Sequence, residues 1–537
     1  MQGMKIPPQT TENKQDSSAD ILSQMRALLV EKEEVIELQD DVIEQKSEVI
    51  SELKKRVKIL EAHLRLANQK RFTSSSEQTS PNQGELFNEV EEVAEPEQDE
   101  LALEDENNTK PKRKTGRKAF NKNLPRVQEF AYLSEADKEG AIDTFFVKVR
   151  EELDIIPAQV RIVEYMQEKA VFPSANGGQS IKAATVIKHP VPKAMGSVNL
   201  MTYIIISKYA DGMPLYRQEN IIKSRYGGDI TRATMANWVI ALARQAQPLI
   251  HLLREYQHRG KLIAMDETAL QVLKEQSRAA TSKKYMWVSL GGLPGQQSIL
   301  FDYDPSRSAE VPIRLLDGFC DGYLQTDGYV SYYEVCKQNN LIHLGCWDHA
   351  RRKFKEAAAD KPKKSKGKAS KADMALSYIN KLYVIERQIE SATPAEKLVA
   401  RQQKALPILD KLKDWLNKNM PRVLKDSLTY KAMKYLANQW DKLVVYCTDG
   451  EFRISNIMTE NAIRPFAVGR KAWLFCDTPR GAHASSVHYS LIETAKLHGL
   501  EPYQYLNSVF KALPYADTVE KIEELLPWNI KEKLSIA

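Results

Sequence analysis

The sequence predicts an α/β core that is interrupted by a helical insertion and preceded by three smaller regions. Three observations lead to this fold class. Strand-like and helical segments alternate between residues 259 and 355, helical periods fill residues 356–449, and apolar residues repeat every seven positions before residue 70. At 537 residues the chain has room for several domains.

Residues 1–70 are predicted to form an N-terminal coiled coil. Two parallel series of apolar residues recur at seven-residue spacing without Pro or Gly. The first series is Leu22, Leu29, Ile36, Ile43, Ile50, Val57 and Leu64. Polar Lys32, Gln39 and Lys46 stand beside it and weaken the seam or set its register. We expect a homo-oligomer; the alternative is a helix packed on its own body.

Residues 71–123 are predicted to be a linker of low order, first acidic and then basic. Residues 84–108 hold eleven acids and no Lys or Arg, and a basic run follows between Lys110 and Lys118. That run is either a solvated linker or a phosphate contact. Because the net charge is +6, the rest of the chain carries about +17 (6 minus −11), which suits a polyanionic partner as well as it suits an ordinary basic surface.

Residues 124–190 are predicted to be a small module with short strands at 127–133, within 159–172 and at 181–187. Residues 191–258 are predicted to be a helix-turn-helix DNA-binding region, with Gly227 and Gly228 at the break. Thr231 or Asp229 is expected to cap its second helix. On that helix Arg232, Thr234 and Asn237 lie opposite the apolar face and are candidate DNA-binding residues; an ordinary helical hairpin is the alternative.

Residues 259–355 read as three strands in a meander, a short helix, and then strand, helix, strand and helix. This order is typical of the RNase H-like fold. Asp266 lies in the middle of the first strand and Asp327 at the end of the fourth, 61 residues later. Residues 356–449 form the helical insertion, residues 450–500 complete the core, and residues 501–537 form a C-terminal helical tail.

The segment 450–500 carries most of the remaining polar signals. Ser455 and Asn456 are good helix caps, and Glu460 follows in the helix that they start, 133 residues beyond Asp327. Pro465 is expected to kink or end that helix, and a second helix is expected from His483 to His498. Three basic residues of the segment are candidate DNA contacts: Arg464, Arg470 and Lys471.

Several motifs in one order resemble the transposases of the IS66 family of insertion sequences. They are KYADGMPLYRQE, AMDET, LQTDGY, GCWDHARRKF, TENAIRPFAVGRKAWLF, PRGAHASS and YSLIETAKLHGLEPYQYL. The resemblance covers residues 190–355 and 450–510 well. It implies a DDE catalytic domain of RNase H-like fold, DNA as substrate, and accessory proteins of the same element. It also implies a zinc-binding module at residues 124–190. This segment contains no cysteine, so we expect that the module does not bind zinc.

The resemblance assigns Asp266, Asp327 and Glu460 as the catalytic, metal-binding triad. Carboxylates from separate elements suit Mg²⁺, for which Mn²⁺ can substitute, and two such ions support in-line phosphodiester chemistry. Other acids remain open as alternatives. They are Asp302, Asp304 and Asp348 for the strand positions, and Asp449, Glu451 and Glu493 for the third acid.

The spacing of Cys336, His343, Cys346 and His349 is compatible with a zinc site, but we favour packed thiols and expect zinc to be no cofactor. His349 is better explained as a residue supporting the metal ligands. The helix that it begins continues into a basic cluster that either contacts DNA or forms a solvated face. This cluster is Arg351, Arg352 and Lys353.

The function expected from the sequence is metal-dependent DNA cleavage and strand transfer at insertion-sequence ends. A catalytically inactive, dimeric DNA-binding derivative and a nuclease of the same fold are the alternatives. The first twenty residues contain no apolar signal region, and no run approaches the roughly 18 apolar residues of a membrane span. All five cysteines follow residue 319, which fits a reducing compartment. We therefore expect a cytoplasmic, nucleoid-associated bacterial protein with no membrane partner.

Overall fold

The computed structural model describes residues 159–173, 179–276, 278–359 and 369–535, with short stretches and single residues before them. Most of the predicted coiled coil and all of the predicted linker lie outside the described residues. The chain divides into two compact units, and each is described by itself. The smaller unit holds Asn88–Ile187 and Tyr216–Thr234, and the larger includes Lys188–Leu215 and Met235–Ala537. Among the helices of the described residues, none is long and apolar enough to cross a membrane.

The described part of the small module is a two-stranded antiparallel ribbon. Strands β1 (Lys169–Pro173) and β2 (Gln179–Ala183) pair so that Val171 lies opposite Ile181, and both of these side chains are exposed. Two of the predicted strands are therefore confirmed, although each is shorter than the apolar pattern suggested. The strand predicted at residues 127–133 lies outside the described residues.

Helices occupy the region predicted as a helix-turn-helix. They are α4 (Val198–Tyr209), α5 (Leu215–Tyr226), α6 (Arg232–Gln245) and α7 (Gln247–His258). The Ser197 hydroxyl accepts the N–H of Leu200 at 3.3 Å and so caps α4. Gly227 follows α5 at φ +68°, a conformation that favours glycine. Thr231 is the cap of α6, because its hydroxyl accepts the N–H of Thr234 at 3.3 Å.

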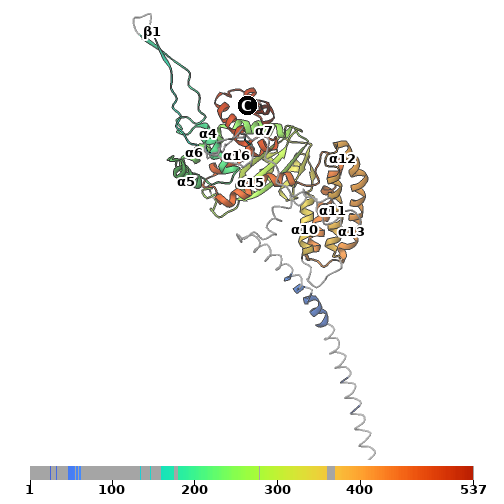
Figure 1. The fold of residues 1–537 in the computed structure, drawn as a ribbon. Helices are drawn as coiled ribbons and strands as arrows, with labels where there is room; N and C mark the ends of the chain where they lie inside the picture. The colour runs from blue at the N-terminus through green and yellow to red at the C-terminus, as the bar shows by residue number, and fades with distance from the viewer. Residues whose placement is uncertain are drawn as a thin grey trace, which may run out of the picture. The chain divides into compact units, whose positions relative to one another are not determined.

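A five-stranded sheet forms the centre of the larger unit (Figure 1), in the order β5-β4-β3-β6-β7. Its strands are β3 (Leu262–Leu270), β4 (Lys284–Gly291), β5 (Ser298–Asp304), β6 (Tyr323–Gln325) and β7 (Ile342–Leu344). The first three form an antiparallel meander, whereas β6 and β7 run parallel to β3. Helix α8 (Glu310–Leu315) precedes β6, α9 (Ser331–Gln338) follows it, and α10 (Trp347–Ala359) follows β7. The mixed α/β class and the predicted order of elements are confirmed.

The two faces of β3 serve different purposes. Ile263 and Met265 are fully buried with Leu324 in an apolar cluster that α8 and α9 cover. Side chains alternate along a strand, so Asp266 and Thr268 lie on the opposite face. There the Arg470 guanidinium donates to the Thr268 hydroxyl at 3.4 Å, which brings helix α15 (Ile457–Trp473) over that face.

Helix α16 (Pro479–Leu497) protects the edge strand β5 with side-chain hydroxyls. Ser490 accepts the N–H of Phe301 at 2.8 Å, and Thr494 accepts the N–H of Ile299 at 3.1 Å and donates to its carbonyl oxygen at 3.0 Å. These contacts occupy backbone groups that an exposed edge would offer to another chain. The helix begins at Pro479, four residues before the predicted start.

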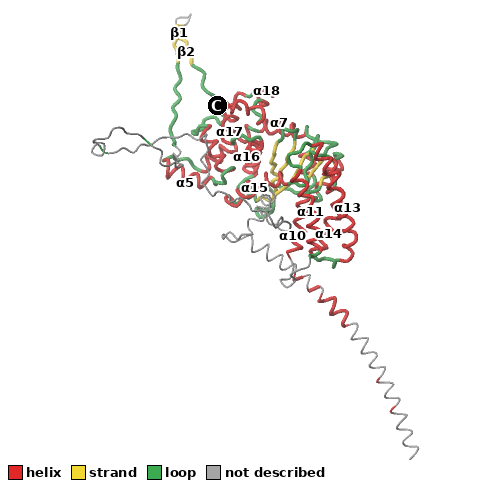
Figure 2. Tube along the Cα trace, turned by 45° about the vertical axis from the view of Figure 1, so that its right-hand side comes forward, coloured by secondary structure: helices red, strands yellow, loops and turns green. Residues whose placement is uncertain are grey.

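The helical insertion packs with α10 around an apolar core of its own. Its helices are α11 (Lys371–Gln388), α12 (Pro394–Ala400), α13 (Leu406–Asn419) and α14 (Leu428–Leu443). Phe354 of α10 is fully buried with Ile379, Leu412 and Leu436. In Figure 1 and in Figure 2, α10, α11 and α13 lie side by side next to the sheet, and Figure 2 also labels α14 in this group.

Helix α15 (Ile457–Trp473) corrects two expectations. Pro465 does not end the helix, which continues through it for eight further residues. Burial of Ala462, Ile463 and Phe466 offsets the roughly 3 kcal/mol that an internal proline costs. Asn456 stands at the cap position but makes no capping bond with its side chain; instead its amide donates to the Met265 carbonyl oxygen at 3.0 Å.

Three helices close the described chain: α17 (Pro502–Ala512), α18 (Val519–Glu523) and α19 (Pro527–Ser535). The Glu501 carboxylate caps α17 by accepting the N–H groups of Tyr503 and Gln504. Tyr505 and Phe510 are fully buried on the inner side of that helix. The predicted helical tail is confirmed over this range.

Candidate active site

Asp266 lies on β3, the central strand of the sheet. It is the fifth residue of β3 and lies opposite Val288 of β4. Its Oδ1 accepts the backbone N–H of Glu267 at 2.9 Å. On the other side of β3, β6 pairs only as far as Ala264, so the chain of β6 leaves the sheet just before it reaches Asp266. Such a divergence at the carboxyl end of parallel strands is where functional groups gather in α/β proteins.

Asp327 lies on the loop that leaves β6. Its Oδ1 accepts the N–H of Tyr329 at 2.8 Å, and its carbonyl oxygen accepts the hydroxyl of Tyr435 at 2.8 Å. Gly328 follows at φ +87°, and a Cβ there would come within 2.9 Å of the Gln439 side chain. Tyr435 and Gln439 belong to α14, so the helical insertion clamps the loop that carries Asp327.

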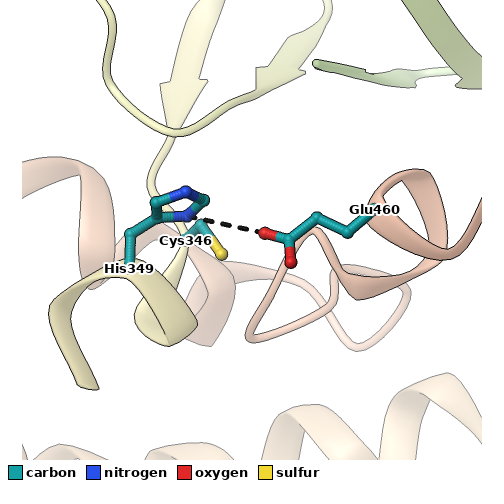
Figure 3. Close-up of side chains that lie close together, drawn as sticks. All are labelled: Cys346, His349 and Glu460. Carbon is teal, nitrogen blue, oxygen red and sulfur yellow. Dashed lines mark ion pairs between the residues drawn. The ribbon is translucent and has the colours of Figure 1, made fainter. Parts of the chain in front are cut away.

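Glu460 enters the same region from the first turn of α15. Its carboxylate lies 3.7 Å from Nδ1 of His349 and 3.6 Å from a terminal nitrogen of Arg352, both on α10 (Figure 3). The starts of α10 and α15 are tied together by the N–H of Trp347, which donates to the Ile454 carbonyl oxygen at 3.2 Å. Tertiary structure therefore joins Glu460 to residues more than a hundred positions away.

The three predicted triad residues converge electrostatically. Burial raises the pKa of Asp266 well above its usual value, and the charges of Glu267, Glu460 and Asp327 raise it further. The single opposing effect is the hydrogen bond from the Glu267 N–H. For His349, burial and the nearby Arg352 lower the pKa, whereas Asp327 and Asp348 raise it. The site is thus a concentration of carboxylate charge with an imidazole at its edge.

A supporting network beside this site was missed at the sequence level. Glu267 is buried on the opposite face of β3, where it pairs with Arg307 and accepts the Tyr332 hydroxyl. The Arg307 guanidinium in turn lies 3.7 Å from the centre of the Tyr329 ring. This chain of contacts links β3 to the Asp327 loop. The signal in the sequence that could have revealed this network is Glu267, the second acid of the motif AMDET.

The alternative acids are engaged elsewhere. Asp348 accepts the hydroxyl of Tyr383, and five others form ion pairs. The pairs are Asp302 with Arg254, Asp304 with Arg314, Asp449 and Glu451 with Lys261, and Glu493 with Lys496. A carboxylate with its own cation is a weaker metal ligand than one among like charges. Glu460 itself lies 3.6 Å from Arg352, farther than the rivals lie from their cations, and the choice of Asp266, Asp327 and Glu460 stays a prediction.

The predicted basic contacts separate into different environments. Arg352 reaches Glu460, whereas Arg351 donates to the Asn380 side chain of α11 at 3.1 Å and Lys353 lies over the ring of Tyr435. On α15, Arg470 is partly buried beside β3, Arg464 is half-buried and Lys471 is exposed. On α6, Arg232 and Asn237 are exposed and Thr234 is half-buried.

The four residues once considered as a zinc tetrad do not assemble. Nε2 of His343 pairs with the Thr326 hydroxyl at 2.7 Å. Burial raises the pKa of Cys336 to about 11, as for a packed thiol. Cys346 and His349 instead meet Glu460, and their donor atoms all lie within 4.8 Å of one another.

Three family models match the chain. The one described as "Transposase IS66 family" matches residues 193–484, and the one described as "IS66 C-terminal element" matches residues 490–528. A third, "Transposase C of IS166 homeodomain", matches residues 59–128, which include the predicted linker. The first of these contains the sheet, the insertion and all three triad residues.

Curated relatives from Sinorhizobium fredii are similar over most of their length. The uncharacterized protein y4qI is 30% identical over 438 residues, which are 79% of this chain and 79% of that protein. The uncharacterized protein y4jD is 28% identical over 73% of this chain and 77% of its own length. The uncharacterized protein y4hP is 27% identical over 71% and 70%, respectively.

Proposed function

The chain belongs to the IS66 family of transposases, and on this premise we propose that it is a DDE transposase that cuts and joins DNA at insertion-sequence ends. The observation that carries the proposal is the environment of Asp266: it is buried, and the charges of Glu460 and Asp327 both raise its pKa. The strand order, with an antiparallel meander and two parallel strands beside β3, supports an RNase H-like fold for this core.

The residues fit a pair of divalent metal ions. Asp266, Asp327 and Glu460 offer hard oxygen donors. Burial and, after it, nearby carboxylate charges raise the pKa of Asp266, and a bound cation offsets both effects. Mg²⁺, or Mn²⁺ in its place, supplies Lewis-acid stabilisation of the oxygens that enter and leave phosphorus. An oxygen-only set suits Mg²⁺ better than zinc, whose usual protein sites include nitrogen or sulfur.

The chain's own residues hold the site in shape. Asp266 is fixed by the strand and by the Glu267 N–H, and Asp327 by Tyr329 and by the hydroxyl of Tyr435. Because these contacts act on the loop and the backbone, they restrict the carboxylates before any ligand arrives. The insertion thereby contributes to the site without supplying a metal ligand.

Basic side chains around the carboxylates suit a phosphate backbone. Arg352 lies at the mouth of the site beside Glu460, and Lys471 is exposed at the far end of α15. Helix α6, with exposed Arg232 and Asn237, is the proposed reading helix for bases. We expect the element ends to bind to the basic side chains around the carboxylates and to helix α6. The affinity should fall steeply as the salt concentration rises.

Assembly belongs to the same proposal. The heptad pattern of residues 1–70 supports a homo-oligomer, and family membership supports accessory proteins of the same element. Two DNA ends must be cut and joined together in transposition, so a self-associating arm has a clear use. A chain that begins at Arg71 lacks this arm, and its mass in solution should be lower than that of the full-length oligomer.

The test is cleavage and joining of DNA that carries the ends flanking this gene, with and without Mg²⁺. A transposase exposes 3′ ends and joins them to target DNA. A nuclease of the same fold gives cuts without joined products, and an inactive derivative binds the ends without cutting them. Either of these two results contradicts the proposal.

A further inference from the structure

Cys346, His349 and Glu460 form a second cluster of donors that overlaps the carboxylate site. The thiol sulfur, an imidazole nitrogen and a carboxylate oxygen all lie within 4.8 Å of one another. In Figure 3 the three side chains point toward a common centre, two from the start of α10 and one from α15. The oxygen-only triad leaves the buried Cys346 thiol without a role.

The cluster is held from several sides. The Cys346 sulfur accepts the N–H of Asn456 at 3.3 Å, and the Asn456 side chain bonds the Met265 carbonyl oxygen of β3 at 3.0 Å. Cys346 is fully buried, and His349 follows one helical turn later. The donors are therefore fixed relative to one another and to β3, which lowers the entropy cost of binding.

The kinds of donor determine which ion they suit. Zn²⁺ bonds sulfur at about 2.3 Å and nitrogen or oxygen at about 2.0–2.2 Å, so donors of a tetrahedral site stand roughly 3.3–3.8 Å apart. The observed separations, none above 4.8 Å, need only small side-chain rotations to reach this. Mg²⁺ does not prefer sulfur, whereas Zn²⁺ and Co²⁺ accept S, N and O together.

A metal ion bound by Glu460 competes with the contact between Glu460 and Arg352. Arg352 lies 3.6 Å from the Glu460 carboxylate, and its side chain is 40% exposed. An ion pair of this length and exposure contributes little, so a metal ion can displace it at small cost. Binding also requires the Cys346 thiol to release its proton to water, which leaves a thiolate–metal bond and one free proton.

We propose that Cys346, His349 and Glu460 form a site for Zn²⁺ or a similar borderline-soft divalent cation, and that its occupation takes Glu460 away from Mg²⁺ and inhibits the enzyme. The inhibition rests on the proposed function, whereas the binding does not. Three protein ligands leave a fourth position for water. Availability of zinc would then regulate DNA cleavage.

The binding test uses the full chain and Co²⁺, without DNA or Mg²⁺. The parent should bind one Co²⁺ with a thiolate-to-cobalt absorption band. Cys346→Ser should lose the band, and Cys336→Ser, a matched control in a different environment, should keep it. Glu460→Gln and His349→Asn should each weaken Co²⁺ affinity by about tenfold or more. A parent without the band, or an unchanged band in Cys346→Ser, overturns the site.

Two further measurements complete the test. If circular dichroism shows that Cys346→Ser does not fold, His349→Asn decides, and an unchanged Co²⁺ affinity in that variant overturns the site. In cleavage assays at fixed Mg²⁺, each activity is scaled to its own zinc-free value, and Zn²⁺ should inhibit the parent at least about tenfold more strongly than Cys346→Ser. Equal inhibition of the parent and of Cys346→Ser by Zn²⁺ contradicts the claim that zinc inhibits cleavage through this site. Co²⁺ binding by a parent that cleaves no DNA contradicts the proposed function and leaves the site standing.

Discussion

Replacing Asp266 by Asn should make the metal-free protein more stable and remove much of its response to Mg²⁺. Asn has the same shape and keeps the oxygen that accepts the Glu267 N–H at 2.9 Å. It removes one negative charge from a site where Glu267, Glu460 and Asp327 repel it. Sites built for function commonly carry such a cost in stability.

The charge of Asp266 is disfavoured first by its burial and then by the like charges around it, and the second effect can be given a size. Two unit charges 4 Å apart repel by about 4 kcal/mol at an effective dielectric constant of about 20, which is an upper bound because Arg352 and Arg307 offset part of it. We expect a net gain of about 1–2 kcal/mol in the free energy of unfolding. At about 2–4 °C per kcal/mol, the melting temperature without metal should rise by roughly 2–8 °C.

Mg²⁺ should stabilise both proteins, but the parent more than the variant. At a concentration about 100 times its Kd, a ligand that binds the folded state alone stabilises it by about 2.7 kcal/mol. The parent should show a shift of this order in a thermal melt, and the variant less than half of it. Asp302→Asn is the matched control, since it breaks an ion pair with Arg254 at 2.7 Å and should lower stability while leaving the Mg²⁺ shift intact. A less stable metal-free Asp266→Asn protein, or an undiminished Mg²⁺ shift, refutes the reasoning.

Three further predictions address other parts of the molecule. Tyr435→Phe removes the bond to the Asp327 carbonyl oxygen, so the Mg²⁺ concentration for half-maximal cleavage should rise about 10-fold or more while the melting temperature changes little; an unchanged metal dependence contradicts a positioning role. Burial lowers the pKa of His488 to about 4, so its neutral form is favoured in the folded state, and the free energy of unfolding should fall by up to about 3 kcal/mol from pH 6.5 to pH 4. A His488→Asn protein should lack that share of the slope in denaturant titrations, and an equal slope would show that the histidine is accessible. Arg232→Ala and Asn237→Ala should weaken binding to the element end more than to random DNA in gel-shift assays, and equal losses would mean that neither reads bases.

Much of the core was predictable because its signals are local. An apolar strand that carries Asp266 near its middle identified β3, since an unpaired buried carboxylate is costly and implies a purpose. The succession of strands and helices likewise followed from residue periods. The position of Thr231 before α6 was a capping signal that the hydrogen bond to Thr234 confirms.

Other features depend on contacts that no local pattern reveals. The continuation of α15 through Pro465 depends on the burial of Phe466 against the rest of the unit, and tertiary packing overrides the cost of the proline. The clamp from Tyr435 onto the Asp327 loop joins residues 108 positions apart. Asn456 was expected to cap its own helix, yet its amide crosses to Met265, 191 positions earlier.

The most direct measurement of the central claim is cleavage of end-bearing DNA by single alanine variants of Asp266, Asp327 and Glu460, with metal-free DNA affinity measured beside it. Each variant should lose cleavage by orders of magnitude, because each loses a metal ligand. Their metal-free affinity should stay equal or rise slightly, because a charge that repels phosphate is gone. Glu451→Ala, which removes an exposed acid paired with Lys261 at 2.6 Å, should cut like the parent. Normal cleavage by the Glu460 variant, or loss of cleavage by a folded Glu451 variant, would contradict the assignment of the third acid, and normal cleavage by all three would contradict the active site itself.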